Sequence, residues 1–145
     1  MKDSHHDVAL TFRRMFFGFA AATCLAISVE LVLLEHVKGW EQRIPFALSI
    51  LIWVAAALGL RPRSAVSIHG VRVLAIVVLI GVLFGTYQHF TGNFEFVTEI
   101  YPELTRTEAL LKAMKGASPL LAPGALALAS FLCLAATHRH PLIAE

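Results

Sequence analysis

Two ionisable side chains stand out in the sequence because apolar residues surround them. Glu30 lies within one long apolar run, and His89 lies near the end of another. A carboxyl group in such surroundings can exchange a proton, pair with a cation or bind a metal ion, and an imidazole can bind a metal ion or a haem iron. Four more polar residues lie near the ends of the same runs: Glu35, His36, Gln88 and Asn93. These six residues define the candidate site.

The spacing of small residues predicts that Glu30 and His89 both face neighbouring helices. Small residues recur every four positions before each of them, namely Gly18, Ala22 and Ala26 before Glu30, and Gly81 and Gly85 before His89. Such spacing lets helices approach closely in lipid, so it marks a packing face. We therefore expect both polar side chains to point into a bundle.

Glu30 and His89 are also expected at the same depth. Glu30 lies 16 positions after Arg14, and His89 lies 17 positions after Arg72. At a rise of 1.5 Å per residue, both fall about 24–26 Å from the boundary that the arginines mark. The sequence therefore predicts that the two side chains pair across the first and third helices. They would line a polar pocket of the outer leaflet near Pro123, with the other four polar residues at its mouth.

The composition indicates that the elements carrying these residues lie in a membrane. Of the 145 residues, 57% are hydrophobic and only 15% are charged, and the mean hydropathy is +0.71. This exceeds what the core of a soluble domain of this size needs, so the lipid bilayer is an expected partner. The formal net charge is only +2, and the basic residues lie at the edges of apolar runs. This distribution argues against a nucleic-acid partner.

Four apolar runs predict an all-α, integral membrane four-helix bundle that forms a single domain over residues 1–145. A helix of about 20 residues crosses the hydrocarbon core of about 30 Å. The expected transmembrane helices span roughly residues 14–36, 44–60, 72–93 and 118–138. The outer loop, residues 94–117, first continues the third helix as far as Pro102. Thr105 and Glu108 then match a capping box, which predicts a short amphipathic helix on the outer membrane surface.

The distribution of Lys and Arg predicts that both termini lie in the cytoplasm. With four spans, seven basic residues share the side of the termini and five lie on the other side. The short loop from Arg61 to Arg72 has no acidic residue, which favours the cytoplasmic side of a bacterial inner membrane. An alternative is a signal peptide cleaved after the small residues Ala26 and Ser28. The apolar run continues past that point, which favours a retained helix.

The sequence contains no catalytic signature, so enzyme activity is not expected. It favours a non-enzymatic membrane component without a cofactor, in a homo-oligomer or a larger membrane complex. A second hypothesis is a small proton-coupled transporter in which Glu30 exchanges the proton. A third is a membrane redox protein in which His36 and His89 bind a haem or a metal ion, with Glu30 as a further metal ligand. Cys24 and Cys133 lie in apolar runs and are expected in the core.

Overall fold

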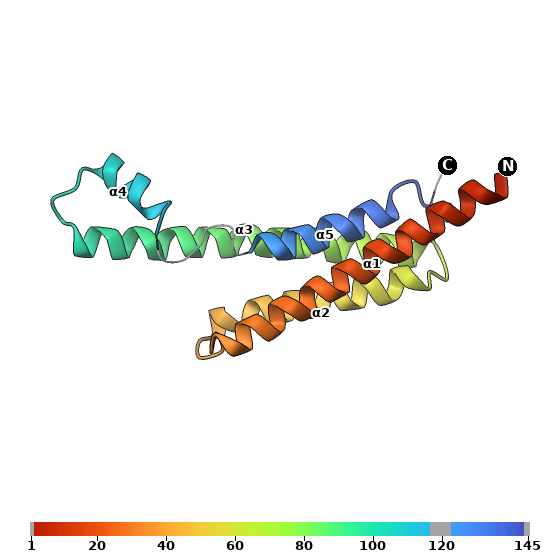
Figure 1. Ribbon diagram of the computed structural model, residues 1–145, viewed down its shortest axis with the longest axis horizontal. Helices are drawn as coiled ribbons and strands as arrows, with labels where there is room; N and C mark the ends of the chain where they lie inside the picture. Colours follow the sequence, from red (N-terminus) through yellow and green to blue (C-terminus); the bar gives the residue numbers. More distant parts are fainter. Residues whose placement is uncertain (1, 117–122, 144–145) are drawn as a thin grey trace.

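The computed structural model describes residues 2–116 and 123–143, with side chains described from residue 7 onward. Five helices follow one another along the chain: α1 (Lys2–Leu33), α2 (Trp40–Leu60), α3 (Ala65–Ile100), α4 (Arg106–Ala113) and α5 (Gly124–Thr137) (Figure 1). No strand occurs among the described residues. The prediction of an all-α chain is confirmed.

Among the described residues, three helices are long and apolar enough to cross a membrane: α1, α2 and α3. Only 17% of the apolar stretch of α1, and 28% of those of α2 and α3, is buried within the protein, so most of their surface is available to lipid. Helix α5 has 14 residues. Its length of about 21 Å is less than the hydrocarbon core of about 30 Å. The predicted fourth span begins in the undescribed residues 117–122, so the four-span count stays a prediction.

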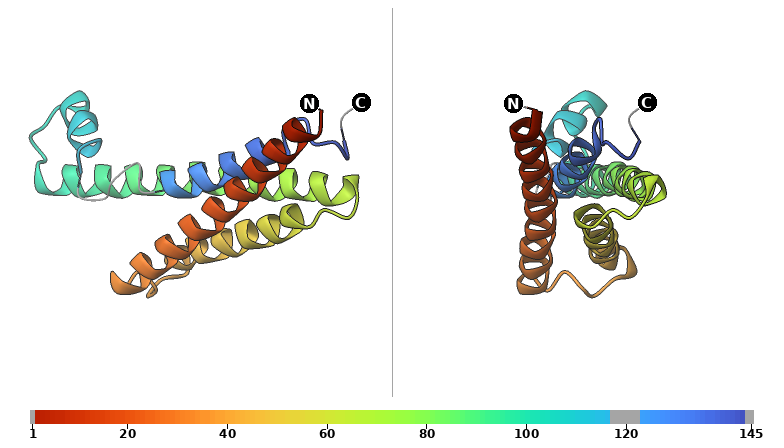
Figure 2. Two further views of the ribbon diagram at one scale, coloured as in Figure 1. Left: turned by 45° about the vertical axis from the view of Figure 1, so that its right-hand side comes forward. Right: turned by 90° about the vertical axis from the view of Figure 1, so that its right-hand side faces the viewer.

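The four apolar helices form a ring in which α2 and α5 separate α1 from α3. Helix α1 packs on α2 and α5, and α3 packs on the same two helices from the other side. Figure 2 shows α2 and α5 between α1 and α3 when the molecule is viewed from its end. Helices α1 and α3 do not touch. The expectation that residues of the first and third helices face one another therefore fails at the level of the fold.

The centre of the ring is built largely from small side chains. Small buried residues come from α1, α2, α3 and α5: Ala20, Cys24, Ala55, Ala56, Ala75, Ala129, Cys133 and Ala136. The buried ring of Phe17 lies against Gly59, where any Cβ would overlap it. A Cβ on Gly81 would lie 2.6 Å from Cδ1 of Leu48. Close helix approach of this kind supplies the packing contacts that stabilise helices in lipid.

Three helices begin earlier than the apolar runs predict. Helix α1 begins at Lys2, α2 at Trp40 and α3 at Ala65, whereas the expected spans begin near residues 14, 44 and 72. Packing of the apolar part carries the helix into polar sequence, because each residue added to an existing helix gains a hydrogen bond without a new nucleation cost. Pro45 consequently lies in the second turn of α2, not in the first.

Helix α3 has 36 residues and is about 54 Å long, which exceeds the thickness of the hydrocarbon core. It ends at Ile100, just before Pro102. The expected short helix is present as α4, and its capping box is confirmed: Thr105 N donates to Glu108 Oε2 (2.9 Å), and Glu108 N donates to Thr105 Oγ1 (3.4 Å). Helix α4 folds back on the end of α3, as Figure 1 shows. We call residues 93–116 the projecting hairpin.

We predict that Gly81→Leu destabilises the bundle by about 1–3 kcal/mol, because the new side chain must displace Leu48. The matched control is Gly18→Leu, since nothing lies within 4 Å of a Cβ at Gly18. Unfolding in mixed micelles measures both losses. Equal losses for the two Gly→Leu variants would contradict this assignment of the packing faces.

Candidate functional site

Glu30 lies on the exposed side of α1, away from the bundle. Gly18, Ala22 and Ala26 are exposed with it. The packing face of α1 is instead formed by Phe17, Ala20 and Cys24. The prediction that the row of Gly18 packs in the bundle is wrong, because insertion of the Phe17 ring against Gly59 turns a different side of the helix toward α2.

The expected pair between Glu30 and His89 is not formed. The two residues belong to α1 and α3, which do not touch. Within the described part of the chain, the one ion pair joins Lys38 Nζ to Glu35 Oε2 (2.8 Å) on the surface. By contrast, the row of Gly81 and Gly85 that precedes His89 does pack, with Gly81 against Leu48 and Gly85 against Pro123.

Glu35 and His36 form the turn that ends α1. The N–H of His36 donates to the carbonyl of Leu31 (2.8 Å), and the N–H of Glu35 donates to that of Val32 (3.0 Å). Glu35 has a left-handed backbone, with φ of 53°. This hydrogen-bond pattern is a Schellman motif, in which glycine usually occupies the left-handed position. Both residues therefore have a structural role in stopping the helix.

The two histidines of the redox hypothesis belong to different parts of the fold, His36 just after the end of α1 and His89 in α3, at a range where only their charges affect each other. Gln88 is exposed and directly precedes His89 in sequence. Among the described residues, however, no three His, Cys, Asp or Glu side chains gather as a metal site. The structure thus shows only a long-range electrostatic relation between these two histidines, and it does not add the further protein ligands that a metal site requires.

Asn93 anchors the projecting hairpin. Its side chain is buried, and its Nδ2 donates to the carbonyl of Ala113 (3.1 Å). Gly116 lies directly on the Asn93 amide, so that a Cβ at Gly116 would overlap it. Val97, Ala109 and Ala113 form a small core beside it. Asn93 therefore holds α4 against α3 and does not line an open pocket mouth.

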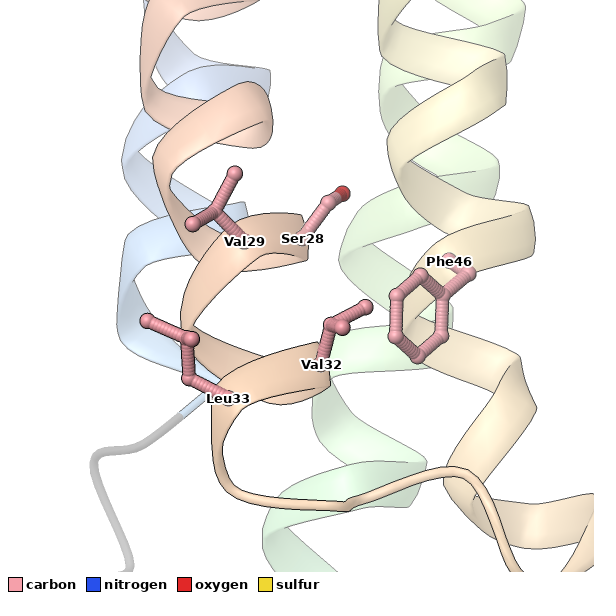
Figure 3. A pocket seen from close by; sticks show the side chains of 5 residues that line it. All are labelled: Ser28, Val29, Val32, Leu33 and Phe46. Carbon is pink, nitrogen blue, oxygen red and sulfur yellow. The ribbon is translucent and has the colours of Figure 1, made fainter.

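An apolar hollow of about 380 Å³ lies between α1 and α2. It is lined by Ser28, Val29, Val32, Leu33 and Phe46 (Figure 3). In Figure 3, Val32 and Phe46 approach from opposite helices across this space. The Ser28 hydroxyl donates to the carbonyl of Cys24 (2.8 Å), as serines in spans commonly do. Glu30 is not part of this lining, so the hollow suits hydrocarbon and not a polar solute.

The fold brings Cys24 and Cys133 together in the core, although they are far apart in sequence. Both are fully buried, as expected for cysteines in apolar runs, and they lie in one core cluster on the packed helices α1 and α5. Ser49 of α2 is buried beside the Cys24 thiol. The sequence did not indicate this proximity, because it depends on α1 and α5 being neighbours.

The most extensive polar contacts lie at the opposite end of the bundle, where two arginines cap the carboxyl end of α5. Arg13 of α1 donates to the carbonyls of Ala136 (3.2 Å), His138 (3.3 Å) and Arg139 (3.0 Å). Arg72 of α3 donates to the hydroxyl of Thr137 (3.3 Å) and to its carbonyl (2.9 Å). The carbonyls of Ala136 and Thr137 belong to the last turn of α5, where they have no partner within the helix and carry its negative dipole end, so guanidinium groups stabilise them.

His140 completes this end of the structure. It is buried, and its Nδ1 accepts a hydrogen bond from the N–H of Leu142 (3.2 Å). Burial and the positive charges of Arg13 and Arg72 lower the pKa of His140 below its ordinary value of 6.5. The ring is therefore neutral at pH 7, which leaves Nδ1 free to accept the hydrogen bond.

Sequence reasoning treated Arg13 and Arg72 only as markers of the membrane boundary. A signal for Arg72 was available, since it stands between Val71 and Val73 and beside a row of residues that are all buried: Ile68, Val71, Ala75 and Val78. Arg13 gave no comparable signal. The adjacent residue Arg14 is also an arginine, yet its side chain is exposed. The residue type alone therefore did not distinguish the two.

Comparison with known proteins adds no relative: no family model, no curated protein and no solved structure matches the chain. The functional conclusion consequently depends on the geometry of the chain itself.

We predict that Arg13→Met lowers the free energy of unfolding by about 1.5–3 kcal/mol, the range for hydrogen bonds to charged groups. Arg14→Met is the matched control, because Arg14 is adjacent, exposed and bonded to nothing in the described residues. Its expected effect is within about 0.5 kcal/mol. Reversible unfolding of both variants in detergent is the measurement. A loss at Arg14 as large as that at Arg13 would show that general surface charge, not capping of α5, stabilises this end.

Proposed function

We propose that the protein is a non-enzymatic membrane subunit whose helical bundle anchors the projecting hairpin for docking to a different protein at the outer membrane face. The single observation that carries the proposal is a set of exposed apolar side chains on this hairpin. Phe96 is 53% exposed and Leu111 is 60% exposed, and Ile100 and Met114 are exposed as well.

The position of these side chains relative to the membrane distinguishes them from apolar side chains that face lipid. Arg72 marks one boundary of the hydrocarbon core, and Ile100 follows it by 28 positions on the same helix. At the helical rise this is about 42 Å, which is beyond a core of about 30 Å. Exposed apolar groups on α3 before this point face lipid and need no other partner. Exposed apolar groups beyond it, such as Phe96 and Ile100 one turn apart on α3, are outside the hydrocarbon core and are typical of a protein interaction surface.

The charge of the hairpin indicates the chemistry of its partner. Glu95, Glu99 and Glu103 are exposed and recur every four positions, next to the row that contains Phe96 and Ile100. None of the three forms an ion pair within the described residues. The basic residues of the hairpin, Arg106, Lys112 and Lys115, belong to its α4 part. Two copies placed with their acidic α3 sides against each other would oppose like charges, which is unfavourable. The surface therefore favours a larger complex, with a partner that presents apolar residues flanked by Lys or Arg.

The transport and redox hypotheses have weaker support in the geometry. Proton-coupled transport requires Glu30 to reach a polar path, and Glu30 lies outside a bundle centre filled by close-packed small residues. The redox hypothesis retains the proximity of His36 and His89 and no further ligand. Docking by the hairpin requires only the exposed apolar and acidic side chains already described.

We further propose a four-span topology, with both termini in the cytoplasm of a bacterium and the hairpin outside. Support comes from the arginines at one end of the bundle, where α1 begins, α2 joins α3, and α5 ends (Figure 1). Arg13, Arg61, Arg63 and Arg72 all belong to this end. An arginine-rich short loop favours the cytoplasmic side.

For the topology, we predict that Thr105→Cys reacts with a membrane-impermeant maleimide added to intact spheroplasts. Thr105 is exposed at the start of α4, and the native Cys24 and Cys133 are buried and should not react. Arg63→Cys, in the connection between α2 and α3, is the control and should react only after the membrane is opened. The reverse pattern would place the hairpin in the cytoplasm.

For docking, we predict that a photo-crosslinking amino acid at Leu111 gives a covalent product with a second, different protein in intact membranes. The same amino acid at Leu83, which is exposed on the membrane-crossing part of α3, is the control and should give no protein product. Adding Glu99→Lys should reduce the Leu111 product by reversing the charge at the surface. A product of twice the chain's mass would instead show self-association, and no protein product at Leu111 would contradict docking.

A further inference from the structure

The end of the bundle that carries the arginines also contains a hollow of mixed character. It has a volume of about 390 Å³ and lies where α2 ends and α3 begins. Its lining comprises Val54, Ala57 and Leu58 of α2, Arg61 and Arg63 of the connection, and Ser67 of α3. It is thus apolar on the side of the membrane-crossing helix and basic at the helix end.

The arginines at this end of the bundle differ in what their side chains contact. Arg13 and Arg72 are committed to the carbonyls of α5. The guanidinium groups of Arg61 and Arg63 have no hydrogen-bond or ion-pair partner in the described part of the chain, and both border the hollow. No acidic residue occurs from Arg61 to Arg72 to neutralise them. Their positive charge is therefore available to an external anion.

The backbone at the same place adds hydrogen-bond donors. Ser64 is the N-cap of α3, and its side chain makes no capping hydrogen bond, so amide groups of the first turn have no side-chain partner. The amino end of a helix carries a partial positive charge and favours anions. Ser67, one turn into α3, contributes a hydroxyl to the lining. These donors supplement the two arginines, which carry the main charge.

We propose that this hollow binds an anionic phospholipid, with the phosphate held by Arg61 and Arg63 and an acyl chain beside Val54, Ala57 and Leu58. The occupant follows from charge and position together. A soluble phosphate would use only the basic half, whereas a phospholipid also covers the apolar half at the depth where headgroups lie. Basic pockets between transmembrane helices recognise anionic headgroups by this combination. The inference does not depend on hairpin docking or on which side of the membrane is cytoplasmic.

The test is competition between lipids for the purified full-length protein. Micelles contain equal amounts of phosphatidylglycerol and phosphatidylcholine, and native mass spectrometry measures the ratio of the two lipids bound. The double variant Arg61→Gln with Arg63→Gln should lose about 30-fold of the preference for phosphatidylglycerol, the effect of two interfacial arginines. Its unfolding transition should be unchanged without added lipid, because neither side chain has a partner in the protein.

The matched control removes the same charge elsewhere at the same end. Arg14→Gln with Arg139→Gln changes two other exposed arginines that do not line the hollow, and it should keep the wild-type preference. Equal loss in the two double variants would mean diffuse surface attraction and would overturn the site. So would a wild-type protein with no preference. Displacement of the lipid by inorganic phosphate at equal concentration would show that the site binds a soluble anion, which would also overturn the proposal.

Discussion

The arrangement of the bundle depends on which groups donate hydrogen bonds to the backbone carbonyls at the carboxyl end of α5. Helix α5 is the shortest of the four apolar helices, and its last carbonyls have no partner within the helix. Arg13 and Arg72 reach these carbonyls from α1 and α3, two helices that do not touch each other. The end of α5 is therefore the point at which both are tied together. Carbonyls at a helix end that lack donors cost free energy where the protein keeps water from them. The two guanidinium groups remove this cost and fix the register of three helices at one end.

Small side chains set the rest of the packing. Once that end is fixed, the helices can remain close along their length only where bulky groups meet glycine or alanine. Phe17 fits against Gly59 and Leu48 fits against Gly81, and each contact joins α2 to a different neighbour. In hydrocarbon, burying a leucine instead of exposing it gains little, so shape complementarity decides the arrangement. This explains why so much apolar surface remains uncovered on α1, α2 and α3 without being a defect.

The elements could be predicted from the sequence because length, hydropathy and capping are local properties. The apolar runs predicted four spans, and three of them are confirmed as helices that are long and apolar enough to cross a membrane; Thr105 with Glu108 predicted the start of α4. The candidate site could not be derived in the same way, because it required the order of helices around the ring. Two rows of small residues looked alike in sequence, yet the row of Gly81 packs and the row of Gly18 does not. Both sides of a membrane helix are apolar, so hydropathy does not distinguish them.

The position of Glu30 shows why equal depth was a misleading criterion. The argument for a pair with His89 assumed that a carboxyl group inside an apolar run must be neutralised by a neighbour. Glu30 lies only three residues before the end of α1 at Leu33 and 17 positions after Arg13, which the proposed topology places at the other boundary of the membrane. At the helical rise the carboxyl is about 25 Å from that boundary, which leaves about 5 Å to the opposite edge of the hydrocarbon core. A glutamate side chain can cover such a distance by extending toward the headgroups, as polar side chains near helix ends do. An exposed Glu30 without a protein partner is consequently compatible with a membrane-spanning α1. Water and headgroups at the membrane edge solvate the carboxyl group, so it does not require pairing with His89.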